Sequence, residues 1–224
     1  MSRAIVFDLD GTLIDSAPDI HWAANAVLAE MNLPQIDLQT LKTFIGNGTR
    51  VLMERCLDHA KVDAGAAEVD AAVARFLDFY SREPAARTVV YSGVRDLLAS
   101  LAKRGDRLGI CTNKPEGVTR AILSDLELGP FAVVVGGDTL PTRKPDPAGL
   151  LAAIDALGAT PADTIFVGDS EVDAETAKAA GVRFALFTSG YRKSPVGAIP
   201  HWVAHATFEE IEQALTAPEI GARA

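Results

Sequence analysis

Five short apolar runs, separated by stretches with helical periodicity, constrain the fold of this 224-residue chain more than any other feature. None of the runs alternates polar with apolar residues, which is typical of strands covered on both faces of a sheet. Between the later runs, apolar residues recur at spacings of three and four, which predicts amphipathic helices. The alternation of strands and helices predicts parallel β-α units in a doubly wound, Rossmann-like α/β sheet. The predicted strands lie at residues 4–7, 108–111, 132–135, 164–167 and 184–187.

The stretch from residue 16 to residue 87 interrupts this alternation. It contains helical patterns and no convincing strand, and its clearest apolar stripe runs from Val69 to Tyr80. Ser16, with a proline and an acidic residue soon after it, is typical of a helix start. We therefore predict a catalytic α/β core formed by residues 1–15 and 88–224, with an inserted α-helical cap domain at residues 16–87.

Composition narrows the class of partner. The formal net charge is -9, which disfavours binding to nucleic acid or to an anionic membrane surface. The two cysteines, Cys56 and Cys111, lie far apart in the sequence and are expected to be free buried thiols. The chain shows no long apolar region near its start and no run of membrane-spanning length. These features predict a cytoplasmic protein. We expect it to act as a monomer or a homodimer.

Two acidic residues, Asp8 and Asp10, follow the first predicted strand. On an extended chain the side chains of residues i and i+2 share a face, so the two carboxylates can converge. In open α/β sheets, ligands bind at the carboxyl ends of the strands. The alternative interpretation is a simple bend, because Asp-Gly is a common turn dipeptide.

Three later loops carry further chemistry at predicted strand ends. Thr112 and Asn113 come before a helix start, where free backbone N–H groups can bind an anion. Lys144 lies in a loop made stiff by prolines and could neutralise a phosphoryl oxygen. Asp169 and Asp173 are four residues apart, and a helical turn would bring them together. Each segment alone has a structural alternative: a helix cap, a solvated lysine or an N-cap. Together they predict a phosphoryl-transfer site with a hard cation such as Mg²⁺.

These motifs closely resemble those of the haloacid dehalogenase-like hydrolase superfamily over nearly the whole chain. Residues 8–12 resemble its first motif, Thr112 the second, Lys144 the third and residues 168–173 the fourth. The helical insert lies where the first type of cap lies in that superfamily.

Several stretches further resemble phosphoglycolate phosphatases. They lie at residues 44–48, 112–115, 136–145 and 190–191. The chain departs from that pattern at Asp146, where a histidine is expected. The resemblance implies a phosphatase of a small anionic phosphate ester, most specifically 2-phosphoglycolate.

The resemblance also implies a role for each motif residue. Asp8 would be the nucleophile and form an aspartyl-phosphate, and Asp10 would act as the general acid and base. Thr112 and Lys144 would grip the phosphoryl oxygens. Mg²⁺ would be held by the Asp8 carboxylate, the Asp10 backbone carbonyl and Asp169. Asp173 would support the metal through water or through Lys144.

Substrate selection is expected to involve the cap and the second motif. Gly46 and Gly48 flank Asn47 in a loop whose backbone could approach the substrate closely. Arg50 follows on the next predicted helix and could reach a substrate carboxylate. In the second motif, Asn113 and Lys114 are candidates for holding the transferring phosphate or the substrate anion. For the loop the alternative is an ordinary interhelical turn, and for Arg50 it is a solvated helix face.

Other functions compete with this prediction. Within the same superfamily the alternatives are a sugar-phosphate phosphatase, a pyrophosphatase or a phosphomutase. By resemblance, Thr12 favours hydrolysis over the mutase reaction, and Asp10 disfavours a dehalogenase, which has no leaving oxygen to protonate. From a different class, a signalling receiver domain or a non-catalytic phosphate-binding protein could gather similar residues. The length of the chain and the helical insert disfavour the receiver domain.

Overall fold

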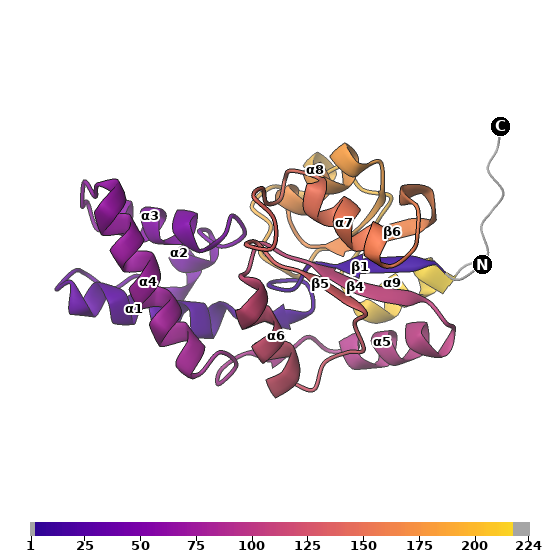
Figure 1. The fold of residues 1–224 in the computed structure, drawn as a ribbon, viewed down its shortest axis with the longest axis horizontal. Coiled ribbons are helices and arrows are strands. Elements are labelled where there is room, and N and C mark those ends of the chain that lie inside the picture. Colours follow the sequence, from indigo (N-terminus) through magenta and orange to yellow (C-terminus); the bar gives the residue numbers. More distant parts are fainter. Residues whose placement is uncertain (1–2, 217–224) are drawn as a thin grey trace.

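A computed structural model describes residues 3–216, and its central feature is a six-stranded parallel sheet (Figure 1). All five predicted apolar runs form strands of this sheet, which confirms the doubly wound α/β class. The sixth strand lies at one edge and was not predicted, because it has three half-buried residues without an apolar run. The strands, in spatial order, are β5 (Val133–Val135), β4 (Arg107–Cys111), β1 (Ala4–Phe7), β6 (Thr164–Gly168), β7 (Arg183–Phe187) and β8 (Val203–His205).

Helices cover both faces of the sheet, as the apolar character of the strands requires. In β1, Ile5 and Phe7 belong to one buried cluster, whereas Ala4 and Val6 belong to the other. The cluster around Ile5 includes side chains of α5 (Val94–Lys103), α6 (Glu116–Asp125) and α9 (Phe208–Thr216). The cluster around Val6 includes side chains of α7 (Ala148–Ala156) and α8 (Glu171–Ala180). Two short 3₁₀ helices, Pro161–Asp163 and Val196–Ala198, lie in the connecting loops.

A second group of helices lies beyond the carboxyl ends of the strands, at the left in Figure 1. It occupies the interval in which the sequence showed helical patterns and no strand. The division into a core at residues 1–15 and 88–224 and a cap at residues 16–87 remains a prediction, and residues 1–2 and 217–224 lie outside the described part. The group consists of α1 (Ala17–Glu30), α2 (Leu38–Lys42), α3 (Thr49–His59) and α4 (Ala66–Arg82).

A two-stranded antiparallel pair joins the helical group to the sheet domain. It is formed by β2 (Ile14–Asp15), just before the helical group in the sequence, and β3 (Val89–Val90), just after it. The buried carboxylate of Asp19 reinforces this connection, because it accepts hydrogen bonds from the backbone N–H of Arg87 at 2.9 Å and from the hydroxyl of Thr88 at 2.7 Å. The start of α1 is thereby tied to the returning chain.

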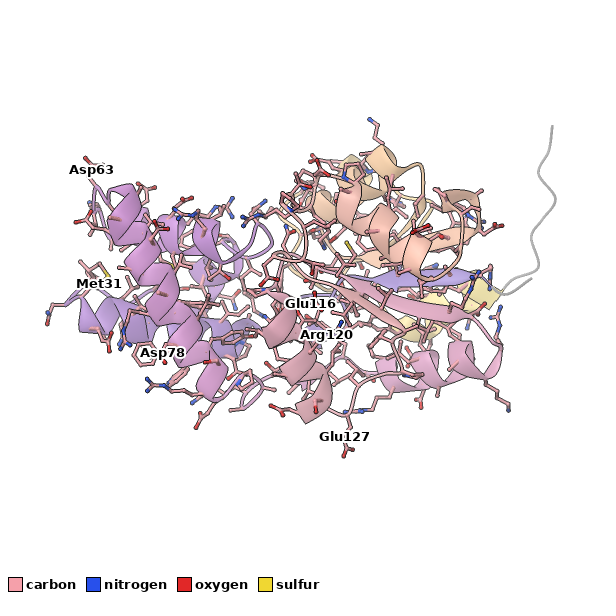
Figure 2. The ribbon with its side chains drawn as sticks, viewed as in Figure 1. Met31, Asp63, Asp78, Glu116, Arg120 and Glu127 are labelled. Atoms are coloured by element: carbon pink, nitrogen blue, oxygen red, sulfur yellow. The ribbon has the colours of Figure 1, made fainter. Side chains whose placement is uncertain are left out.

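The outer surface carries dispersed charges. Figure 2 shows Asp63 and Glu127 pointing outward at distant places on the molecule, and both are exposed. Glu116 and Arg120 form an ion pair of 2.8 Å on α6. No helix within residues 3–216 is both long enough and apolar enough to span a bilayer.

Candidate active site

Three buried carboxylates meet at the carboxyl ends of two adjacent strands. Asp8 follows β1, and Asp169 follows β6, which pairs with β1 in parallel. Asp173 lies in the first turn of α8, where its backbone and side chain exchange hydrogen bonds with Ser170 in a capping box. One oxygen from each of these three carboxylates lies within 4.8 Å of the others. The side chains of Asp169 and Asp173, four residues apart, thus lie close together, as predicted from the sequence.

Lys144 supplies the positive charge for this carboxylate cluster. Its ammonium lies 2.6 Å from Oδ1 of Asp173 and 2.9 Å from Oδ1 of Asp8, and the side chain is almost entirely buried. The loop between β5 and α7 therefore places Lys144 against the acidic residues rather than in solvent. The alternative of a solvated surface lysine is wrong.

The donor set of the carboxylate cluster fits a hard divalent cation. Asp8, Asp169 and Asp173 share the interior with the single ammonium of Lys144, so the ionised cluster carries excess negative charge. Oδ1 of Asp8 is buried and lacks a partner in hydrogen-bond geometry among the described residues, since Lys144 contacts it only as an ion pair. Clustered carboxylates without histidine are the ligands that Mg²⁺ prefers.

Burial perturbs the protonation of these groups in a consistent direction. Burial raises the pKa of Asp8 to about 6, against the opposing effect of Lys144. Burial and the charges of Asp173 and Asp8 raise the pKa of Asp169 well above its usual range. For Lys144, burial acts to lower the pKa, but the carboxylates of Asp173 and Asp8 hold it above its ordinary value. A bound cation would relieve the repulsion between these carboxylates.

The second acidic residue of the first motif has different surroundings. Asp10 accepts a hydrogen bond of 2.5 Å from the hydroxyl of Ser16 and forms an ion pair with Lys114, whose ammonium lies 3.0 and 2.9 Å from its two carboxylate oxygens. Gly11 directly follows Asp10 in the sequence and has φ +86°. A Cβ atom added at Gly11 would lie 2.5 Å from Oδ2 of Asp169. Only glycine combines this backbone conformation with so close an approach.

The second motif forms one wall of a small cavity. Thr112 comes directly after β4, and its Oγ accepts a hydrogen bond of 3.3 Å from the backbone N–H of Lys114. Asn113 donates from Nδ2 to the carbonyl oxygens of Gly46, at 2.9 Å, and Lys144, at 3.0 Å. Asn113 thereby connects the second motif to the cap loop and to the lysine loop.

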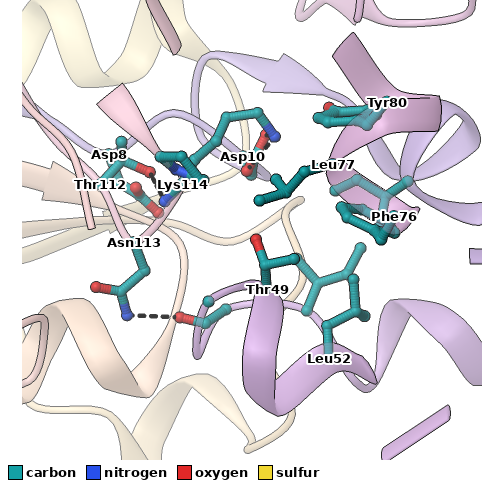
Figure 3. A pocket seen from close by; sticks show the side chains of 15 residues that line it. Asp8, Asp10, Thr49, Leu52, Phe76, Leu77, Tyr80, Thr112, Asn113 and Lys114 are labelled. Carbon is teal, nitrogen blue, oxygen red and sulfur yellow. Dashed lines mark hydrogen bonds and ion pairs between the residues drawn. The ribbon is translucent and has the colours of Figure 1, made fainter. Parts of the chain in front are cut away.

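The cavity lies between the strand ends and the helical group (Figure 3). Its volume is about 50 Å³, which is enough for roughly four water molecules. Asp8, Asp10 and the second motif form its core side. Its cap side is mostly apolar, with side chains from α1, α3 and α4: Ile20, Leu52, Phe76, Leu77 and Tyr80.

The predicted cap residues separate into two pairs. Gly46 and Gly48 line the cavity, and both have positive φ, at +113° and +87°. Asn47 and Arg50 do not line it. The guanidinium of Arg50 forms ion pairs with Asp70 and, at 3.7 Å, with Glu54 on the outer surface of the helical group. A substrate contact by Arg50 or Asn47 therefore remains a prediction that this arrangement does not support.

Sequence reasoning missed two tyrosines at this site. Tyr80 was assigned to an apolar helical stripe, yet it also lines the cavity, and the ammonium of Lys114 lies 4.6 Å from its ring centroid. Tyr191 donates its backbone N–H to Oδ2 of Asp169 at 2.5 Å and its hydroxyl to Asp15 at 2.6 Å. The Gly190-Tyr191 resemblance was the available signal for Tyr191, whereas nothing local distinguished Tyr80 from its apolar neighbours.

Several known proteins are similar to this chain in sequence and in fold. The haloacid dehalogenase-like hydrolase family matches residues 5–187. A phosphoglycolate phosphatase of Cereibacter sphaeroides is 48% identical, over 94% of this chain and 96% of its own. A phosphoglycolate phosphatase of Rhodospirillum rubrum is 43% identical, over 99% of this chain and 94% of its own. The crystal structure of a predicted phosphoglycolate phosphatase from Haemophilus somnus superposes with a TM-score of 0.88 at 31% identity, covering 96% of this chain and 98% of that one.

The fold has a doubly wound α/β core, with the candidate site at the carboxyl ends of its strands. The chain belongs to the haloacid dehalogenase-like hydrolase family. Within that family it is a phosphatase, that is, a phosphoric monoester hydrolase, and it resembles phosphoglycolate phosphatases.

Proposed function

We propose that this protein is a magnesium-dependent phosphatase that hydrolyses 2-phosphoglycolate to glycolate and phosphate, with Asp8 as the nucleophile. The observation that carries the proposal is the buried cluster of Asp8, Asp169 and Asp173 around Lys144, next to a cavity of about 50 Å³. The cavity places the carboxylates of Asp8 and Asp10 opposite a mostly apolar cap wall, which suits a small organic phosphate. The relatives named phosphoglycolate phosphatase support the choice of substrate.

Asp8, the Asp10 backbone carbonyl and Asp169 would hold Mg²⁺, with Asp173 in support. The bound ion would supply positive charge that offsets the repulsion between the nucleophile and the substrate phosphate. This assignment agrees with the buried Oδ1 of Asp8, which has an ion pair with Lys144 but no partner in hydrogen-bond geometry among the described residues, and with the excess of acidic groups in the cluster.

Hydrolysis would take place in two steps. A carboxylate oxygen of Asp8 attacks phosphorus, the bond from phosphorus to the glycolate oxygen breaks, and Asp10 donates a proton to that oxygen. Asp10 then removes a proton from water, which attacks the aspartyl-phosphate, releases phosphate and regenerates Asp8. Lys144 and Thr112 would neutralise and orient the phosphoryl oxygens during both steps.

The location and assembly of the protein are further parts of the proposal. Two free, buried cysteines agree with a reducing compartment, so we place the enzyme in the cytoplasm. We propose that it acts there as a monomer or a homodimer.

A panel of phosphate esters, assayed with Mg²⁺ and with a chelator, tests the proposal. We expect a preference for 2-phosphoglycolate over hexose phosphates and pyrophosphate, and loss of turnover in the chelator. Comparable rates on unrelated esters would remove the substrate assignment, and full activity in the chelator would remove the metal.

The variant Asp8→Asn tests the nucleophile, with Asp63→Asn, an exposed acid, as the matched control. We expect kcat to fall by at least about a thousandfold for Asp8→Asn and to stay within about twofold for Asp63→Asn. A phosphoryl adduct on the peptide that contains Asp8, trapped by acid quench in Asp10→Asn, would be the direct evidence. Substantial turnover by Asp8→Asn would refute the role of Asp8.

A further inference from the structure

Tyr80 has a buried polar atom that the fold leaves unpartnered. The residue lies near the end of α4, is 2% exposed and lines the cavity. Its hydroxyl makes no hydrogen bond that meets geometric criteria with any residue of the described chain. A buried hydroxyl without a partner is rare, because its desolvation is not compensated. Because Tyr80 lines the cavity, a bound ligand could provide the missing partner.

The ammonium of Lys114 lies close to Tyr80, 4.6 Å from the centroid of its ring. Figure 3 shows this ammonium beside the Asp10 carboxylate, with the ring of Tyr80 across the gap. An ammonium donates three hydrogen bonds, and Asp10 accepts two of them. Among the lining residues, Lys114 is the only basic side chain. Lys114 is therefore the one cationic side chain with which this cavity wall can meet a second anionic group on a substrate.

The rest of the cap wall would not accept such a group. The side chains of Ile20, Leu52, Phe76 and Leu77 are apolar, and Thr49 adds one hydroxyl. A carboxylate placed against apolar side chains without a partner would lose its hydration without compensation. Arg50, the basic residue expected from the sequence, is engaged with Asp70 and Glu54 outside the cavity.

We infer that Lys114 and the Tyr80 hydroxyl form a receptor for the carboxylate of the substrate, and that this pair determines the preference for carboxylate-bearing phosphate esters. The inference rests on the proposed phosphatase function and deepens it, because it assigns the substrate class to two side chains. Burial raises the pKa of Tyr80 to about 12, so its hydroxyl keeps the proton that it would donate. Tyr80 comes from the helical group and Lys114 from the sheet domain, so a bound carboxylate would also bridge the two.

The experiment compares 2-phosphoglycolate with 2-hydroxyethyl phosphate, in which a hydroxymethyl group replaces the carboxylate. We expect Tyr80→Phe to lower kcat/KM for 2-phosphoglycolate by about tenfold and Lys114→Met by about 10- to 100-fold, the range for hydrogen bonds to charged groups. For 2-hydroxyethyl phosphate, Tyr80→Phe should stay within about twofold of the wild type. Inhibition by glycolate should weaken in both variants, whereas inhibition by inorganic phosphate should not change in Tyr80→Phe.

Matched controls separate a local effect from a general one. Tyr91→Phe removes a tyrosine hydroxyl that does not line the cavity, and Lys103→Met removes an exposed lysine from α5. Both should leave the preference between the two esters within about twofold. Lys114→Met also takes the ion-pair partner from Asp10, so a loss common to both esters is expected there. If Lys114→Met fails to fold, Lys114→Arg and Tyr80→Phe continue the test, because they retain the charge and the ring.

Binding to Asp8→Asn distinguishes failure of this inference from failure of the proposed reaction. In that background, calorimetry should show weaker binding of 2-phosphoglycolate after Tyr80→Phe or Lys114→Met, by the same fold-changes, and unchanged binding of 2-hydroxyethyl phosphate after Tyr80→Phe. Equal losses for both esters in Tyr80→Phe, or no change in preference in either variant, would overturn the receptor. An enzyme that turns over neither ester would refute the proposed reaction, while the calorimetric comparison would still decide the receptor.

Discussion

Replacing Lys144 with methionine should destabilise the metal-free protein severely. The ammonium of Lys144 lies 2.6 Å from Asp173 and 2.9 Å from Asp8, and its side chain is 3% exposed. Methionine fills a similar volume but removes the positive charge. Three carboxylates would then share a buried site without a cation from the chain.

The magnitude follows from the burial of this cluster. Removing one partner of a buried ion pair costs about 3–5 kcal/mol, because the remaining charge stays desolvated and uncompensated. For a protein of this size, each kcal/mol lowers Tm by roughly 2–4 °C, so we expect a decrease of about 6–20 °C. The double variant Lys144→Met/Asp173→Asn removes one of the uncompensated charges and should recover part of the loss.

Thermal unfolding in chelator, followed by circular dichroism, is the appropriate assay. Lys103→Met, at an exposed position, is the control and should change the free energy of unfolding by less than about 0.5 kcal/mol. Addition of Mg²⁺ should recover part of the stability of Lys144→Met. A loss below about 1 kcal/mol in chelator would refute the reasoning, since the cluster would then tolerate its charges without Lys144.

Three further predictions concern the metal, the first turn and the thiols. Mg²⁺ at a hundredfold excess over its Kd should stabilise the wild type by about 2.7 kcal/mol, measured as an increase in Tm, and Asp169→Asn should abolish this increase. Gly11→Ala places a Cβ at positive φ and 2.5 Å from Asp169, so chemical denaturation should show a loss of about 1–3 kcal/mol; an unchanged midpoint would contradict this. Burial raises the pKa of both Cys56 and Cys111 to about 12, so at pH 8 the thiols stay protonated and should react with a chromogenic disulfide reagent only after unfolding. Rapid labelling of the native protein would contradict that last expectation.

The five main strands and the candidate catalytic residues could be predicted because each is marked by a local sequence pattern. Each apolar run is continuous, and Asp8, Thr112 and Asp169 follow their strands directly. The parallel sheet then brings the strand ends to one edge, so a correct fold class places these residues together.

The short strands could not be predicted in the same way. β2 and β3 have two residues each and lie far apart in the sequence, so their pairing has no local period. β8 completes the sheet edge with three half-buried residues and is defined by its pairing with β7 rather than by composition.

The sequence by itself determined the order of strands and helices and the types of side chain at each strand end, since these depend on periodicity and on covalent neighbours. Only the tertiary structure decided which charges meet. It paired Lys114 with Asp10, placed Arg50 outside the cavity and placed Tyr80 on the cavity wall. The physical reason is that electrostatic contacts depend on distance and burial, and packing between the helical group and the sheet sets both.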